Sequence, residues 1–328
     1  MDKELRLMIK KIMFLALSFT ALGPCFQTQA QQARKVGILT LTSNDPMVEI
    51  LRHGLRELGY LEGQNIVIEH RFAEGKLDRL PDLAAELVQM NVDVIVARAT
   101  PVVQAAKNAT STIPLVIHSA DPLGSGFVAT LARPGGNITG LSTMAPELAG
   151  KRLELLREIL PKLSRVAFLA HGGDPAYRLF IKEAQDAAER FAMKFQPVVT
   201  GGPQEFEAAF SAIVRERAGA LIVQPLFTAV LGHGGRIADL ATRNRLLSVS
   251  DPRRFAESGG LISYGPDFDS LYRGAATYVD KILKGTKPAD LPVEQPTKFE
   301  FTINLKAAKQ IGLTIPPNVL ARADRVIK

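Results

Sequence analysis

Polar residues that could hold a small ligand stand where the apolar segments of this sequence end. They are Ser43, Thr100, Ser119, Asp121, Asp174, Gln224 and Asp251. Hydroxyl and amide groups form directed hydrogen bonds, and a carboxylate holds an ammonium group by a charge-assisted hydrogen bond. If the ligand is an α-amino acid, we expect its carboxylate at Ser43, Thr100 or Ser119. Its ammonium group then requires an acid, and Asp121 or Asp251 is the predicted partner.

These residues have a second interpretation, because Ser, Thr and Asp are also the usual N-caps of helices. Asp121 and Asp251 form a matched pair, since a proline follows each of them directly after a predicted strand. Proline fits the first turn of a helix, so each aspartate could cap that helix instead of facing a ligand. Both interpretations stay open at this point.

No pattern typical of catalysis, metal binding or cofactor binding is present in the sequence. The histidines fall in separate predicted elements, and none forms the His-x-x-x-His pair that a metal site on one helix requires. Gly124–Ala129 matches G-x-G-x-x-A but follows the fourth predicted strand, so we interpret it as a turn and not as a dinucleotide fingerprint. We therefore expect neither an enzyme nor a bound metal or cofactor.

The candidate ligand residues are positioned by two series of apolar strands that alternate with helices. Strands are predicted at residues 35–42, 65–69, 92–97 and 113–118, and again at 165–169, 194–199, 220–223 and 247–250. Within each series, a strand starts about 20 to 30 residues after the one before it, the spacing of one strand, one crossover helix and two short loops. The sequence predicts an α/β fold with two similar lobes of parallel sheet, and the cleft between them is the expected ligand site.

Smaller predicted elements lie between and after these series. We expect a short helix at 127–132, strands at 138–141, 261–264 and 299–303, and a long helix at 267–283. The last of these elements do not fit two lobes that simply follow one another along the chain. They indicate that the chain crosses between the lobes more than once.

Residues 1–30 have the organisation of a secretory signal peptide. Lys10 and Lys11 precede the uncharged segment Ile12–Leu22, and Ala30 ends a small-x-small cleavage pattern. The apolar segment is shorter than the roughly 20 residues of a permanent membrane span. We therefore expect a periplasmic protein that begins near Gln31. Whether translation starts at Met1 or at Met8 stays open.

Composition excludes several other classes of protein. Cys25 is the only cysteine and lies in the leader after a proline, which argues against a lipid anchor and leaves the mature chain without disulfides or thiolate sites. The formal net charge is +7, but the basic residues alternate with acidic ones and form no cluster with aromatic residues. Nucleic-acid binding therefore has no support.

Segments that occur in order along the mature chain resemble one known family. They are GLRELGYxEGQN (residues 54–65), LARPGGNITG (131–140), GLISYG (260–265), ADLPVEQP (289–296) and GLTIPP (312–317). The chain resembles the ABC-transporter substrate-binding proteins that include tryptophan/tyrosine-type receptors. The segment His-Gly-Gly-Asp-Pro at residues 171–175 departs from the Asn-Pro-x-Asn-Pro form of such proteins, which leaves the identity of the ligand open.

This resemblance implies a type I periplasmic-binding fold, in which two Rossmann-like lobes are joined by a three-strand hinge. By implication, the N-terminal lobe is 35–142 plus 265–296, and the C-terminal lobe is 143–264 plus 297–328. The hinge residues are then Gly140, Leu141, Tyr264 and Gly265.

The implied function is that of a monomeric receptor that closes on a small polar ligand, with an amino acid or related carboxylate favoured. The receptor then delivers this ligand to an inner-membrane ABC permease. The alternatives are a ligand-sensing module for a membrane receptor and, third, an α/β hydrolase or transferase.

Overall fold

The computed structural model describes residues 33–328, which contain two β-sheets. The predicted signal peptide, with Cys25, lies outside the described residues. The first sheet has five parallel strands in the order β2-β1-β3-β4-β5. Its strands are β1 (Arg34–Thr40), β2 (Ile66–Phe72), β3 (Val94–Arg98), β4 (Leu115–Ser119) and β5 (Ile138–Ser142).

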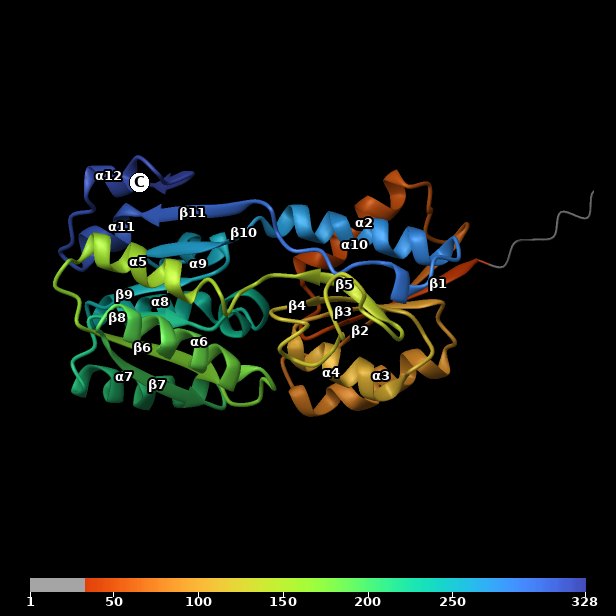
Figure 1. The fold of residues 1–328 in the computed structure, drawn as a ribbon, viewed down its shortest axis with the longest axis horizontal. Helices are drawn as coiled ribbons and strands as arrows, with labels where there is room; N and C mark the ends of the chain where they lie inside the picture. Colours follow the sequence, from red (N-terminus) through yellow and green to blue (C-terminus); the bar gives the residue numbers. More distant parts are fainter. Residues whose placement is uncertain (1–32) are drawn as a thin grey trace, which may run out of the picture. The chain divides into compact units, whose positions relative to one another are not determined.

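Helices cover both faces of this sheet, and we call the sheet with its helices the first lobe (Figure 1). Because both faces are covered, its strands are apolar over most of their length, as parallel sheets require. One face carries α2 (Pro46–Glu57) and α10 (Phe268–Leu283), and the other carries α3 (Leu80–Gln89) and α4 (Thr100–Ala109). Short 3-10 turns lie at η1 (Leu77–Arg79) and η4 (Pro288–Asp290).

The second sheet has seven strands in the order β12-β11-β10-β9-β8-β6-β7, and only its β10–β11 pair is antiparallel. With the helices that cover it, this sheet forms the second lobe. Its strands are β6 (Arg165–His171), β7 (Lys194–Thr200), β8 (Ala220–Val223), β9 (Leu247–Ser250), β10 (Ile262–Pro266), β11 (Phe299–Asn304) and β12 (Arg325–Ile327).

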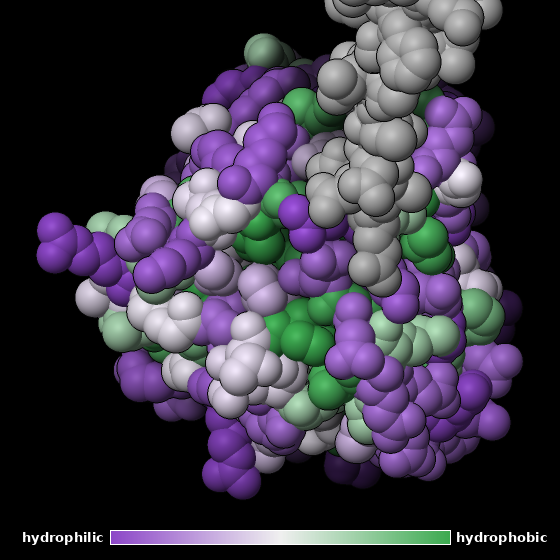
Figure 2. Space-filling view, turned by 90° about the vertical axis from the view of Figure 1, so that its right-hand side faces the viewer, coloured by the Kyte–Doolittle hydropathy of each residue, from purple (hydrophilic) through white to green (hydrophobic). Residues whose placement is uncertain are grey.

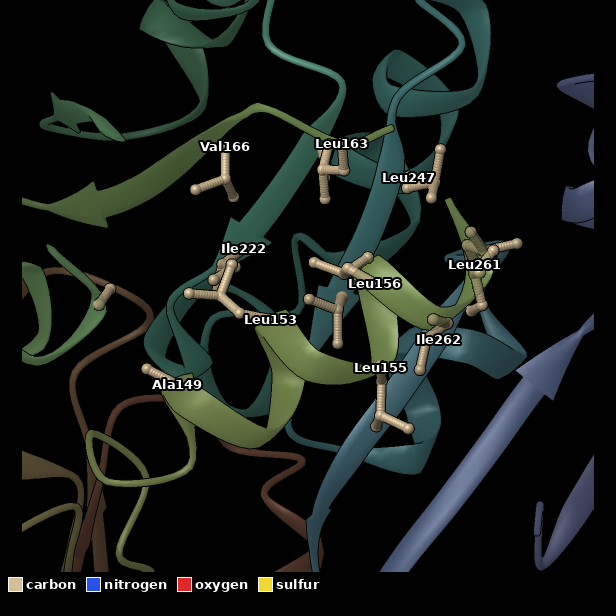
Figure 3. Close-up of a cluster of buried hydrophobic side chains, with 14 of the residues drawn as sticks. Ala149, Leu153, Leu155, Leu156, Leu163, Val166, Ile222, Leu247, Leu261 and Ile262 are labelled. Carbon is tan, nitrogen blue, oxygen red and sulfur yellow. The ribbon is translucent and has the colours of Figure 1, made fainter. Parts of the chain in front are cut away.

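The core of the second lobe lies on both faces of its sheet. Helix α5 (Ala149–Ile159) packs Leu153 and Leu156 into one cluster with the strand residues Ile222 and Ile262, as Figure 3 shows. The other helices are α6 (Tyr177–Arg190), η2 (Pro203–Glu205), α7 (Phe206–Arg215), the π-helix η3 (Leu226–Val230), α8 (Gly234–Arg243), α9 (Arg253–Glu257), α11 (Leu305–Gln310) and α12 (Pro317–Leu320).

The chain passes between the two sheets repeatedly. It leaves the first sheet after Ser142, returns at Asp267 between β10 and α10, and leaves again between Glu294 and β11. The first and last of these passages lie together, because the Ser142 N–H donates to the Glu294 carbonyl at 2.8 Å. Helix α10 therefore packs on the first sheet, although it follows a strand of the second.

A buried arginine of α5 holds two of these passages on the second lobe. The Arg152 side chain donates from Nε to the Tyr264 carbonyl at 3.1 Å and from Nη1 to the Ala145 carbonyl at 3.0 Å. Its remaining nitrogen pairs with Asp251, and both side chains are almost completely buried. Arg152 thus connects α5, the carboxyl end of β9 and both passages through one charged group.

Some elements differ from the sequence prediction. The predicted helix at 127–132 is wrong. Gly126 takes φ +68°, and the Ala129 N–H bonds to the Pro134 carbonyl, which closes a loop instead of a helical turn. The sequence analysis also missed η3, α9 and β12, which are too short to show a clear apolar period.

One end of the first lobe has a mostly hydrophilic surface. Figure 2 shows the end of the first lobe that carries β1, where hydrophilic residues predominate over the coloured surface and hydrophobic ones form patches between them. The large hydrophobic side chains exposed among residues 33–328 are scattered along the chain: Leu58, Leu61, Leu123, Val199 and Val214. No helix within the described range is long and apolar enough to cross a membrane.

Replacement of Arg152 by methionine should destabilise the protein by about 3–5 kcal/mol, because the Asp251 carboxylate would remain buried without its counter-ion. The double variant Arg152→Met/Asp251→Leu should recover much of this loss, since apolar groups can replace a buried ion pair at little cost. Urea unfolding measures both effects. Arg243→Met, which breaks an exposed pair with Asp239, is the matched control and should change little. Equal effects of Arg152→Met and Arg243→Met would contradict this interpretation.

Candidate functional site

A small cavity lies at the carboxyl ends of strands from both sheets. Its volume is about 50 Å³, enough for only a few water molecules at roughly 10–15 Å³ each. A second cavity of about 40 Å³ shares three of its lining residues. The first cavity is lined by Arg98, Ala99, Thr100, His118, Ala120, Thr143 and Phe268 on one side, and by Asp174, Phe180, Pro225, Leu226, Ala229 and Val230 of the second lobe on the other.

The start of helix α4 forms part of the first-lobe wall. No side chain caps this helix, and its N-cap residue Ala99 has φ +82° and ψ 145°, a backbone conformation that non-glycine residues rarely adopt. The Ala99 N–H donates to the His118 carbonyl at 2.9 Å, which ties the start of the helix to β4. The free N–H groups of an uncapped helix start, with the buried Thr100 beside them, can receive an anion.

Arg98 ends β3 and is buried with its counter-ion. Its Nη1 lies 2.5 Å from Asp45 Oδ2, its Nη2 donates to the Ala229 carbonyl at 3.0 Å, and its Nε has no hydrogen-bond partner among the described residues. The guanidinium carbon lies 5.3 Å from the centre of the Tyr272 ring. Burial opposes the positive charge, but the Asp45 carboxylate outweighs it and holds the pKa of Arg98 above its ordinary value.

His118 contributes a neutral side chain to the same wall. Burial, and then the positive charge of Arg98, lower the pKa of His118 to about 3. Its ring packs against Tyr272 and Phe268, with centroids 5.1 and 6.0 Å away. Its Nε2 atom is buried and has no hydrogen-bond partner within residues 33–328. A neutral imidazole of this kind can donate to a ligand or accept from one, depending on its tautomer.

Asp174 is the acid of the second-lobe wall. It is 3% exposed, and its carboxylate accepts from the Ala176 N–H at 3.0 Å and from Gln224 Nε2 at 2.7 Å. Gln224 is oriented in turn, because its Oε1 accepts from the His171 N–H at 2.7 Å. Burial raises the pKa of Asp174 to about 6, while the Ala176 hydrogen bond lowers it.

The two lobes touch around the cavity. Besides the Arg98–Ala229 hydrogen bond, Thr42 Oγ1 donates to the Val230 carbonyl at 3.4 Å. Val230 of η3 also packs into the same apolar cluster as Val102 of the first lobe. The π-helix is therefore a part of the second lobe that closes against the first.

Of the predicted ligand residues, Thr100 and Asp174 line this cavity and the others do not. Ser119 and Gln224 are buried outside its lining, and the Ser119 hydroxyl has no partner among the described residues. Ser43 is exposed. The positions of residues after predicted strands therefore identified one lining residue on each wall of the cavity, but not the other lining residues.

The two Asp-Pro acids have different environments. Asp121 accepts from the Gly124 N–H at 2.8 Å and so stabilises a turn, with no helix following it. Asp251 precedes α9 but is paired with Arg152. Neither carboxylate faces the cavity, so the sequence symmetry between them does not extend to their surroundings.

The predicted hinge residues lie within strands. Gly140 and Leu141 belong to β5, and Tyr264 and Gly265 belong to β10. Gly140 has φ +139°, and a Cβ atom there would lie 2.1 Å from the Ile117 carbonyl oxygen, so no larger residue fits. The sheet ladders hold these residues in place, and the connecting residues lie just beyond them.

Sequence reasoning missed several residues of the site. Arg98, Asp45 and His118 were not predicted, and Phe268 comes from a helix that is distant in sequence. One local signal for Arg98 existed, because it is a charged residue at the end of the otherwise apolar strand VIVAR. Within residues 33–328, no group of His, Cys, Asp or Glu side chains could hold a metal ion.

The raised pKa of Asp174 predicts a pH dependence of stability. Because the folded protein binds this proton more tightly than the unfolded chain, the contribution of Asp174 is fully present below pH 3.8 and is lost as the pH rises through about 6. At 1.36 kcal/mol per pKa unit, the loss is at most about 3 kcal/mol. Relative to Asp174→Asn, the wild type should therefore lose stability between about pH 4.5 and 7.5 in urea unfolding. A difference between the two proteins that stays constant with pH would contradict this prediction.

Known proteins similar to this chain include one curated relative and two solved structures. A tyrosine-binding protein of Clostridioides difficile (strain R20291) is 25% identical over 292 residues, 88% of this chain and 83% of that protein. The structure of an ABC domain in complex with L-Trp from Streptococcus pneumonia is 26% identical, covers 90% of this chain and 100% of that one, and has a TM-score of 0.82. The ligand-free, open structure of a substrate-binding protein with adhesive properties from Clostridium difficile is 25% identical, covers 90% and 99%, and has a TM-score of 0.64.

The family model of ABC transporter substrate binding proteins matches residues 35–327, almost the whole described chain. This match confirms the resemblance seen in the sequence, and the superposition with the L-Trp complex confirms the predicted type I periplasmic-binding fold. The chain belongs to the family of ABC transporter substrate-binding proteins.

Proposed function

We propose that this chain is an exported receptor that captures an amino acid or a related small carboxylate and delivers it to an inner-membrane ABC permease. The observation that carries the proposal is the cavity at the strand ends of both sheets, to which both lobes contribute polar groups. The relatives support the ligand class, because one is described as tyrosine-binding and another holds L-Trp.

In this proposal the ligand carboxylate lies at the start of α4. The donors on that side are the uncapped N–H groups of the helix, the Thr100 hydroxyl and the unpartnered Nε of Arg98. Asp45 already compensates the charge of Arg98, so binding there relies on directed hydrogen bonds more than on net charge.

The other predicted ligand residues do not line the present cavity, and we propose indirect or conditional roles for them. Gln224 orients Asp174 from behind the second-lobe wall, and Ser119 lies next to the lining of the first-lobe wall. We propose contacts of Ser43, Asp121 and Asp251 with the ligand only where the lobes rearrange around it.

Opening and closure of the lobes control access to the site. A solute larger than a few waters enters the present cavity only if the lobes move apart. The better superposition with the L-Trp complex than with the open, ligand-free relative supports a closed arrangement here.

We place the hinge beside the predicted residues Gly140–Leu141 and Tyr264–Gly265. Bending falls on the connecting residues Thr143–Met144 and Asp267, because the neighbouring strand residues are held by their ladders. The lobes that move are close to those implied by the resemblance, 35–142 plus 265–296 and 143–264 plus 297–328, except that Gly265 and Pro266 stay with β10 in the second lobe.

A thermal-shift screen of the mature protein against standard L-amino acids, organic acids, sugars and nucleosides tests this function. A ligand at 100 times its Kd should stabilise the protein by about 2.7 kcal/mol, which raises Tm by roughly 5 °C in a protein of this size. We expect the largest shift from an amino acid or another small carboxylate. A shift produced only by sugars or nucleosides would overturn the ligand class, and no shift with any compound would overturn the receptor function.

Export has its own test. If residues 1–30 are a cleaved signal peptide, the protein recovered from the periplasm should have the intact mass of a chain that begins near Gln31. A retained leader, or a lipid mass on Cys25, would overturn this part of the proposal.

A further inference from the structure

We propose that Asp174 is the counter-ion for an ammonium group of the ligand, so that the receptor selects amine-bearing solutes over amine-free carboxylates, sugars and nucleosides. This inference rests on the proposed function and narrows its ligand class. The charges in the walls of the cavity are the first observation that supports it.

Among the described residues that line the cavity, Asp174 is the charged group without a counter-ion. Arg98 is paired with Asp45, and His118 is neutral. Within the described residues, no ion pair includes Asp174; burial raises its pKa, and one backbone hydrogen bond lowers it. A buried carboxylate in this situation requires either a proton or a cation from outside the protein, and a ligand ammonium supplies the cation.

The carboxylate of Asp174 is already oriented for such a contact. Its two hydrogen bonds, from the Ala176 N–H and from Gln224 Nε2, fix both oxygen atoms. A carboxylate offers about four acceptor positions, so about two remain for further donors. Because Gln224 is itself held by the His171 N–H, the orientation does not depend on the ligand.

The other acids predicted from the sequence are less suited to this role. Asp251 has a buried counter-ion in Arg152, so a ligand ammonium would have to compete with that guanidinium. Asp121 is half-buried and receives the Gly124 N–H in a turn. Neither lines the cavity, whereas Asp174 does.

The first-lobe wall, opposite Asp174, suits a negatively charged group, so we expect the ligand to carry a carboxylate as well as an ammonium group. The start of α4 and the Nε of Arg98 present donors from the first lobe, and Asp174 presents an acceptor from the second. A zwitterion that reaches both walls satisfies both sets at once, and it does so only when the lobes are closed. An amine-free carboxylate satisfies one wall and leaves Asp174 buried and unpaired.

Matched pairs of probes test this assignment. L-Tyrosine, L-tryptophan and the remaining standard L-amino acids are each titrated by calorimetry at neutral pH beside the 2-hydroxy acid with the same side chain. The two members of a pair differ by an ammonium group against a hydroxyl group. For the amino acid that binds best, we expect the wild type to prefer it over its 2-hydroxy acid by at least about 30-fold, the lower end for a desolvated charge pair.

Variants locate the preference in Asp174. Asp174→Asn should weaken binding of the amino acid by at least about 30-fold. It should change the affinity for the 2-hydroxy acid by no more than a few-fold, so that the preference is lost. Asp186→Asn, the same change at an exposed position of α6, is the control and should keep the preference. If Asp174→Asn does not fold, because its amide would face the Gln224 N–H, Asp174→Ala replaces it.

The outcomes separate this inference from the function on which it rests. Tightest binding of a sugar, a nucleoside or an amine-free acid would overturn the role of Asp174 while the protein remained a receptor. An unchanged preference in Asp174→Asn or Asp174→Ala would do the same. Failure of every probe to bind would overturn both proposals.

Discussion

A single buried guanidinium, that of Arg152, fixes the place where the chain passes between the two sheets. It bonds to a carbonyl of the first passage and to a carbonyl of β10, the strand that leads into the second passage, and it pairs with an acid at the end of β9. Both passages are therefore anchored to the second lobe as far as Ala145 and Tyr264. In the closure that we propose, bending in these two passages falls in the few residues beyond Ala145 and Tyr264.

Three buried aspartates near the cavity show how different partners create different roles. Asp45 and Asp251 each have an arginine, and in both cases the pair joins segments that are distant in sequence. Such pairs contribute little net stability compared with an apolar replacement, but the loss of one partner is costly. Asp174 has hydrogen bonds without a cation. The first two acids are therefore parts of the architecture, and the third is the one whose electrostatic partner is missing from the described protein.

The fold could be predicted from the sequence to a greater extent than the site. Strands β8 and β9 were predicted with the bounds that the structure has, because short apolar runs between turn signals have few other interpretations. The helix predicted at 127–132 failed because one glycine with positive φ and one non-local backbone bond outweigh helix propensity there. In the site, Thr100 and Asp174 followed from their positions after strands. Arg98 did not, because its role depends on Asp45, Ala229 and Tyr272, and no local pattern reveals those contacts.

An acid without a counter-ion has a cost in the free protein that a ligand can remove. The raised pKa of Asp174 reflects this cost, since burial disfavours the charged form. In our proposal, a bound ammonium group offsets the cost of burying the Asp174 charge. A bound uncharged group leaves that cost in place. Discrimination then comes from the penalty for the wrong ligand as much as from attraction to the right one. In our proposal, the same carboxylate that weakens the free receptor couples closure of the lobes to the charge of the solute between them.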